Sequence, residues 1–84
     1  MRVYVQHVTS TPARTGKTRH AVFLAFGLNQ PREDLVVHTW NDLAADICER
    51  ARRWQQPVEV TTTDTAWGPR ITDLKILPPE EQIA

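Results

Sequence analysis

The sequence predicts a mainly β domain with one helix, folded as a small five-stranded barrel. Five segments favour β structure, and several of them alternate apolar and polar residues as half-buried strands do. Between the third and fourth of these segments, the apolar spacing changes to that of a helix. Closing five strands into a barrel removes the exposed edges that a smaller open sheet would leave. The expected order is strand, strand, strand, helix, strand, strand.

The chain has 84 residues, which is enough for one small domain. We place this domain at residues 1–77. The remaining residues, 78–84, read "PPEEQIA" and are Pro-rich and acidic, so we expect them to form a flexible tail. A domain of this size buries only about 60% of the surface that its unfolded chain exposes, so nearly every large apolar residue is needed in the core.

The first predicted strand covers Arg2–Val8, "RVYVQHV". Its alternation places Val3 and Val5 on the inner side and Tyr4 on the outer side. Tyr4 could contact a ligand there, but it is a weaker candidate than the binding residues named at the end of this section. The polar segment Thr9–Thr18 follows. It contains a proline and a glycine, which favour a loop or the tip of a hairpin.

The second predicted strand, Arg19–Phe26, stops at a glycine. We expect its bulkier side to face the core, with His20, Val22, Leu24 and Phe26. The other side would face outward, with Arg19, Ala21, Phe23 and Ala25. A turn is expected at Leu28–Asp34, and a third strand at Leu35–Trp40. In this third strand either Val36, His38 and Trp40 or Leu35, Val37 and Thr39 could face inward.

The predicted helix carries an apolar stripe formed by Leu43, Ile47, Ala51 and Trp54. We therefore expect Trp54 to be buried in the core, and also Trp40 just before the helix. Thr39 or Asn41 can cap the first turn, because both side chains accept hydrogen bonds from free backbone N–H groups. Pro57 marks the end of the helical segment.

A second hairpin completes the predicted fold. The segment Pro57–Thr65 alternates, which places Val58 and Val60 on the inner side. The turn Ala66–Pro69 leads into the last strand, Arg70–Leu77.

Charge is balanced overall but unevenly distributed along the chain. The formal net charge is zero, which disfavours a protein whose whole surface attracts phosphate. All ten acidic residues lie from Glu33 onward, whereas the chain up to that point carries only basic residues: Arg2, Arg14, Lys17, Arg19 and Arg32. These five charges either form a local positive patch or simply solvate the surface.

Several classes of protein are disfavoured by the composition. The single cysteine, Cys48, cannot form an internal disulfide, which fits a reducing cytoplasmic setting. No cysteine and histidine spacing suggests a metal site, and no signal peptide or membrane-spanning segment is evident, so we expect a soluble protein without cofactors. Ser10 is the only serine and lies in no catalytic motif, and we expect nothing to assemble a nucleophile, base and orienting acid. The chain is predicted not to be an enzyme.

Gly16-Lys17-Thr18 matches the end of a phosphate-binding loop. Such a loop needs an earlier glycine where this chain has Thr11, and it leads into a helix whose N–H groups hold the phosphates. Here Pro12 lacks an N–H group and a β-favouring segment follows. We therefore predict that Gly16 turns the chain at a hairpin tip.

Three segments, "HAVFLAF", "VHTWNDLAADI" and "QPVEVTTTDTAWGPRITDLKI", resemble the small OB-fold nucleic-acid-binding domains of bacteria and phages. The resemblance covers about Val3 to Leu77. It implies a five-stranded OB-fold-like barrel that binds oligonucleotides on the face of its second and third strands, between the first and last hairpin loops. Single-strand binders of this kind combine cations that follow the phosphate backbone with aromatic rings that stack on bases.

On this basis the expected nucleic-acid-binding residues are Arg14, Lys17, Arg19, Phe23, His38, Trp67 and Arg70. Two of them have a structural alternative: Phe23 could be covered on a strand buried on both sides, and Trp67 could fold back over the end of the barrel. The expected ligand is single-stranded DNA or RNA. The alternative is an interaction module of the same fold, which binds a protein or a second copy of itself.

Overall fold

The computed structural model describes residues 2–27 and 35–78. It contains five strands and one helix in the predicted order: β1 (Arg2–Pro12), β2 (Thr18–Ala25), β3 (Val36–Thr39), α1 (Asp42–Trp54), β4 (Pro57–Thr65) and β5 (Gly68–Ile76). The turn predicted at residues 28–34, including Arg32, and tail residues 79–84 lie outside the described part of the chain.

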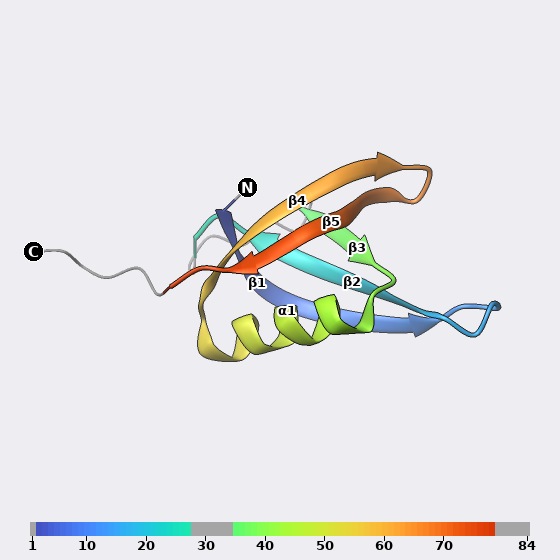
Figure 1. Cartoon of the computed structure of the whole chain (residues 1–84), viewed down its shortest axis with the longest axis horizontal. Coiled ribbons are helices and arrows are strands. Elements are labelled where there is room, and N and C mark those ends of the chain that lie inside the picture. The colour runs from blue at the N-terminus through green and yellow to red at the C-terminus, as the bar shows by residue number, and fades with distance from the viewer. Residues whose placement is uncertain (1, 28–34, 79–84) are drawn as a thin grey trace, which may run out of the picture.

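The strands form a closed barrel in the order β1-β2-β3-β5-β4 (Figure 1). Neighbouring strands are antiparallel except for β3 and β5, which run parallel and pair at His38 and Arg70. The helix α1 lies between β3 and β4 in the chain and packs across one side of the barrel. The predicted five-stranded OB-fold-like barrel with one helix is confirmed.

The first strand belongs to both halves of the barrel, and it is longer than predicted because Thr9–Pro12 continue the pairing with β2 instead of forming a loop. Residues Arg2–Tyr4 pair with β4, whereas Tyr4–Pro12 pair with β2. The register with β2 shifts by one residue between Val5 and His7. A bulge of this kind bends the strand and increases its twist, which lets β1 turn the corner from one partner to the other.

The core is formed mainly by β-branched and leucine side chains from the strands. The predicted inward positions of Val3, Val5, Val22, Leu24, Val58 and Val60 are confirmed, since each is buried. In β3, Val37 pairs with Val22 and Thr39 pairs with His20, so the set containing Val37 and Thr39 faces the interior. This register settles the choice that the short third strand left open.

The end of β2 departs from the predicted alternation. Phe26 is 49% exposed, so its assignment to the core is wrong. The strand ends at Ala25, and Phe26 lies in the bend that follows, where strand periodicity no longer directs its side chain. Ala25 was expected to face solvent but is fully buried.

The helix packs on the barrel through small side chains. Ala45, Cys48 and Ala51 are buried, whereas Leu43 is 68% and Trp54 is 69% exposed. The prediction that Trp54 belongs to the core, on one stripe with Leu43, is therefore wrong. Small residues allow the helix backbone to approach the valine-rich barrel closely. The half-buried Ile47 and the exposed Leu43 border a hollow beside β5, whereas Trp54 is exposed at the end of the helix.

Both ends of α1 are capped. Asn41 is the N-cap, and its side-chain oxygen accepts hydrogen bonds from the backbone N–H groups of Leu43 (2.9 Å) and Ala44 (3.2 Å). At the other end, Gln55 adopts a left-handed conformation with φ of 53°. The helix thus ends at Trp54, and two residues separate it from Pro57, where β4 begins.

Candidate nucleic-acid interface

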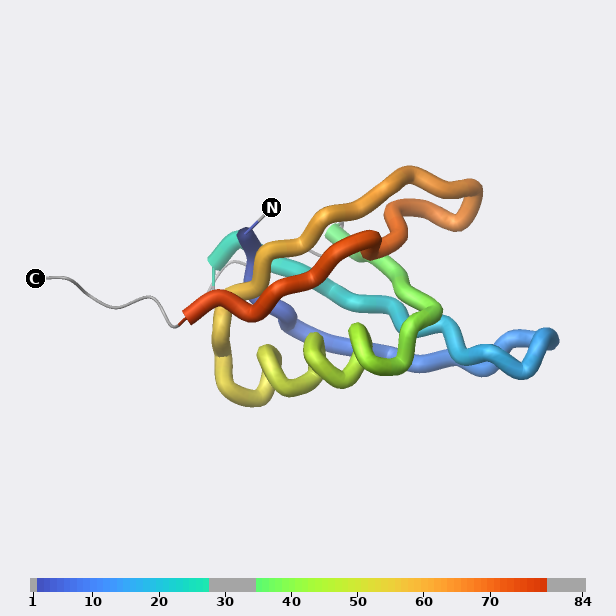
Figure 2. The backbone as a smooth tube through the Cα atoms, in the orientation of Figure 1, coloured from blue at the N-terminus to red at the C-terminus, as the bar shows by residue number. Residues whose placement is uncertain are grey.

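The two hairpins, β1–β2 and β4–β5, project at the same end of the molecule, and the connection between β3 and α1 lies between them (Figure 2). An open groove with a volume of about 590 Å³ lies at this end. Its lining comes from all three segments: Ala13, Arg14, Thr15, Lys17, Trp40, Trp67 and Arg70. Four of the seven predicted binding residues, Arg14, Lys17, Trp67 and Arg70, are thus brought together.

The β1–β2 tip presents its cations through a tight turn. The Ala13 N–H donates to the Lys17 carbonyl at 2.8 Å, and the Gly16 N–H donates to the Ala13 carbonyl at 3.1 Å. Gly16 has φ of +83°, a conformation that glycine adopts at little cost. After this turn the chain enters β2 rather than a helix, as predicted, so no helix N-terminus faces Lys17 as it would in a phosphate-binding loop.

The β4–β5 turn presents Trp67. The Thr65 hydroxyl accepts a hydrogen bond from the Trp67 N–H at 3.1 Å and donates one to the Gly68 carbonyl at 2.7 Å. Gly68 has φ of +103°, which lets the chain reverse here. The Trp67 side chain is 74% exposed and does not fold back over the end of the barrel.

Trp40 is the second aromatic residue of the groove. It follows β3, directly before the N-cap of α1, and is half-buried rather than enclosed in the core as expected. Its place in the sequence could have indicated that it belongs to the groove, because the junction between β3 and the helix lies at the end of the barrel that carries the hairpin tips. The groove therefore has indole rings from two separate segments.

Charge in the groove is of one sign. Arg14, Lys17 and Arg70 line it, and no acidic residue of the described chain does. A small region of positive charge thus exists on a chain whose formal net charge is zero. In such a region the potential attracts phosphate groups or other anions.

Arg19 and His38 lie behind the groove rather than in its lining. The Arg19 guanidinium approaches the Trp67 carbonyl at 3.5 Å, and so links β2 to the β4–β5 turn. His38 is only 2% exposed. Burial lowers the pKa of His38, Arg19 and Arg70 lower it further, and a hydrogen bond with the Pro69 backbone opposes them. His38 is therefore mainly neutral at neutral pH. Direct contact with a ligand would require the residues that bury its side chain to move.

Phe23 lies on the outer side of β2, as predicted, but further along the strand than the groove. Its ring is half-buried and packs against His7 of β1, with ring centroids 5.7 Å apart. It pairs with Val36 of β3 and is not part of the groove lining. Its predicted role in binding thus depends on a ligand that extends from the groove along the β2–β3 face.

Comparison with known proteins identified no similar protein. No protein-family model, curated protein or solved structure matches the chain. The functional interpretation consequently rests on the geometry of the groove and on the sequence features that predicted it.

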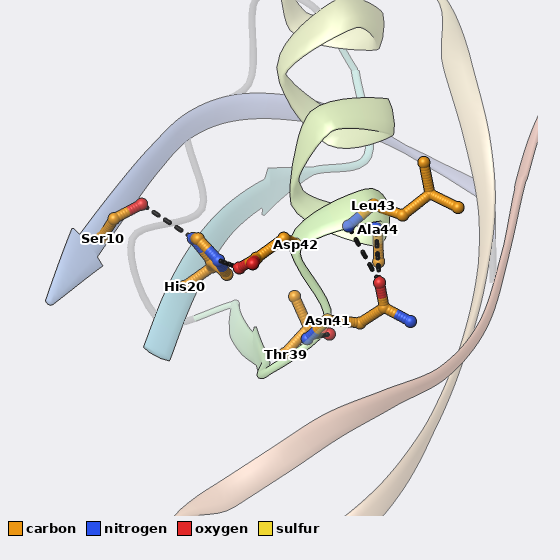
Figure 3. A network of polar contacts seen from close by, with 7 residues as sticks. All are labelled: Ser10, His20, Thr39, Asn41, Asp42, Leu43 and Ala44. Carbon is orange, nitrogen blue, oxygen red and sulfur yellow. Dashed lines mark hydrogen bonds and ion pairs between the residues drawn. The ribbon is translucent and has the colours of Figure 1, made fainter. Parts of the chain in front are cut away.

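A second polar cluster joins β1, β2 and α1 (Figure 3). The Ser10 hydroxyl lies 2.8 Å from Nδ1 of His20, and Nε2 of His20 lies 2.8 Å from Oδ1 of Asp42. A carboxylate only accepts hydrogen bonds, so Nε2 of His20 donates to Asp42, and the second ring nitrogen, Nδ1, shares a hydrogen bond with the Ser10 hydroxyl. The expectation that serine, histidine and acid would stay apart is therefore wrong.

This cluster lies near the turn of the β1–β2 hairpin, two residue pairs before the last pair, Pro12 and Thr18. Ser10 pairs directly with His20 in the sheet, and Asp42 is the first residue of α1. His20 is 8% exposed and faces the interior, so the cluster ties the hairpin to the start of the helix. Sequence spacing gave no signal for it, because its members come from three different elements.

Within residues 2–27 and 35–78, no group of three His, Cys, Asp or Glu side chains is arranged to hold a metal ion. The one helix found there, α1, is too short and too polar to cross a membrane.

Proposed function

We propose that the chain binds single-stranded nucleic acid in the groove between the β1–β2 and β4–β5 hairpins. One observation carries the proposal: the groove combines two indole rings with three cationic side chains (Trp40, Trp67, Arg14, Lys17 and Arg70). Bases stack on aromatic faces while cations follow the phosphates, and the faces of bases are freely accessible only in an unpaired strand. The resemblance to small OB-fold nucleic-acid-binding domains supports the same function.

The proposal also explains how a chain of zero net charge can bind a polyanion. Three cations in one groove act at short range, whereas the ten acidic residues are distributed over the later part of the chain. If all three cations contact phosphates, the slope of log K against log salt is about −2 for a single strand. Stacking of one base on each indole would add about 1–3 kcal/mol per base.

The test is a titration of a labelled oligothymidylate at two salt concentrations, followed by fluorescence anisotropy. We expect binding that weakens with salt, and Lys17→Ala to reduce the slope by about 0.7, the contribution of one phosphate contact. An oligomer of abasic units carries the same charge but no bases, and it should bind more weakly. A duplex of the same length is the second control.

The results separate nucleic acid from other anions. Absence of binding to the oligothymidylate at low salt and tens of micromolar protein would overturn the proposal. Equal affinity for the abasic oligomer would show an anion site without stacking, and so would also contradict it. The same titration with an oligouridylate compares RNA with DNA.

A further inference from the structure

The outward side of α1 carries a pattern that the proposed binding groove does not use. Leu43 and Trp54 are both largely exposed and lie about three helical turns apart, which places them on the same face. Asp46 and Arg50, both exposed, lie between them on that face. Asp46, Arg50 and Trp54 line one shallow hollow together with Glu49 and Arg53, so they are neighbours at the surface.

The barrel covers little of this face of α1: Leu43 borders a hollow that Ile71 and Leu74 of β5 also line, and Trp54 lies outside it. Ala45, Cys48 and Ala51 are the residues buried against the barrel. Leu43 and Trp54 do not form one continuous apolar patch, since Asp46 and Arg50 lie between them, so their exposure alone does not define an interaction site. The order of the residues on the face, apolar, acidic, basic and apolar, indicates what kind of partner fits.

We propose that this face of α1 pairs in an antiparallel manner with α1 of a second copy of the chain, about a two-fold axis. Leu43 and Trp54 lie at nearly equal distances from the middle of the helix, as do Asp46 and Arg50. A two-fold axis through the middle therefore places Leu43 against Trp54 of the partner subunit and Asp46 against Arg50 of the partner subunit. The surface is self-complementary, as a two-fold interface requires.

Charge excludes the parallel arrangement. Parallel pairing in register would place Asp46 opposite Asp46 of the partner subunit, and like charges across an interface are unfavourable. Antiparallel helices also align their macrodipoles favourably. Glu49 and Arg52 do not compete with this pairing, because Arg52 Nε already donates to Glu49 Oε1 at 2.8 Å.

The size of the surface predicts weak association. α1 has 13 residues and is therefore about 20 Å long, so one face of it is smaller than the roughly 800 Å² that each partner contributes to a standard interface. We expect a dimer whose fraction rises with protein concentration, rather than a permanent one. The hairpin groove lies outside this surface, so dimerisation and oligonucleotide binding can be measured separately.

The test is sedimentation equilibrium over an approximately hundredfold range of concentration, which shifts a weak equilibrium by mass action. Asp46→Arg places two positive charges opposite each other, and Arg50→Asp places two negative charges. Each should weaken dimerisation by about tenfold or more. The double variant Asp46→Arg/Arg50→Asp exchanges the two charges and should restore dimerisation to near the unmodified level.

Two further variants complete the experiment. Asp64→Arg makes the same change in charge as Asp46→Arg, but at an exposed position in β4, and it should leave dimerisation unchanged. Trp54→Glu removes an apolar side chain from the proposed interface at the last residue of the helix. It therefore tests the interface even if circular dichroism shows that the charge variants have lost helical structure.

A chain that is monomeric throughout the concentration range would overturn the inference. So would a dimer that tolerates Trp54→Glu, or a folded double variant that fails to recover. Oligonucleotide binding should be unchanged in the double variant Asp46→Arg/Arg50→Asp, which keeps the net charge of the unmodified chain, at concentrations where both proteins are monomeric.

Discussion

Nε2 of His20 lies 2.8 Å from Oδ1 of Asp42, and this contact joins β2 to the first turn of α1. The two side chains differ in environment: the His20 side chain is 11% exposed, whereas that of Asp42 is 85% exposed. Solvent therefore screens one end of the interaction, and its contribution to stability is that of a surface pair. The contact nevertheless holds the part of the β1–β2 hairpin near its turn against the helix.

We expect Asp42→Ala to lower the free energy of unfolding by about 1 kcal/mol, the sum of a partly exposed hydrogen bond and a favourable charge at a helix N-terminus. Urea unfolding measures the change. Asp46→Ala is the matched control, because it removes an exposed acid from the same helix without a histidine partner among the described residues. A double-mutant cycle of Asp42→Ala with His20→Gln should show coupling, and simple additivity would contradict the role given to this contact.

His38 makes stability depend on pH. Its folded pKa lies below the ordinary value of 6.5, because burial and the neighbouring arginines disfavour the charged ring. The unfolded chain therefore binds more protons than the folded chain as pH falls below 6.5, and stability is lost in that direction. Only well above pH 6.5, where the ring is neutral in the unfolded chain as well, does His38 contribute no slope.

The measurement for His38 is the unfolding midpoint in urea at pH 7.5 and pH 5.5, for the unmodified chain and for His38→Gln. We expect the variant to lose less stability between the two values, because its amide does not titrate. Equal losses in the two proteins would show that other groups cause the pH dependence.

Part of this structure could be predicted from the sequence, and part could not. Alternation identified Val3, Val5, Val58 and Val60 as core residues because strand periodicity converts directly into a side of the sheet. The corresponding argument from helical periodicity identified the wrong buried side of the helix. The spacing of large apolar residues favoured Trp54, but the distance between α1 and the barrel is set by its small residues.

Part of the groove could also be predicted, because residues in a turn between two strands lie at the end of the barrel. Arg14, Lys17 and Trp67 lie at hairpin tips, and tips at one end of a barrel come together once the strand order is known. Trp40 was missed because its environment depends on how β3 meets the helix. The Ser10 and His20 contact required the register of β1 with β2, which the alternation alone does not specify.

Gly16 should be sensitive to substitution for conformational reasons alone. Its φ is +83°, and a Cβ atom added there would have no atom within 4 Å, so Gly16→Ala creates backbone strain without a steric clash. We expect a loss of about 1–2 kcal/mol in the free energy of unfolding. Gly16→Asn should cost less, since asparagine tolerates the left-handed region better. Equal losses for both variants would contradict this explanation.

Cys48 should report on unfolding. It is fully buried on α1, and burial together with the nearby Glu49 raises the pKa of its thiol to about 11. The thiolate is the reactive form, so the folded chain should react with a disulfide reagent only when it opens. We expect labelling to accelerate with urea in parallel with the loss of helical circular dichroism. Rapid labelling of the folded chain would show that α1 separates locally from the barrel.

The two indoles of the groove should contribute to oligonucleotide binding, whereas the third tryptophan should not. Trp40→Ala and Trp67→Ala each remove a stacking surface worth about 1–3 kcal/mol, which corresponds to roughly 5- to 150-fold in affinity. Trp54→Ala is the matched control, because Trp54 is about as exposed as Trp67 but lies on α1, outside the groove.

Quenching of tryptophan fluorescence gives an independent readout for the same variants. A base stacked on an indole should quench its emission, so the quenching caused by an oligonucleotide should persist in Trp54→Phe and diminish in Trp67→Phe. Unchanged affinity for both Trp40→Ala and Trp67→Ala would place the ligand elsewhere on the barrel. Because Trp67 is more exposed than Trp40, its substitution perturbs the fold less, and its result decides between stacking and a purely electrostatic contact.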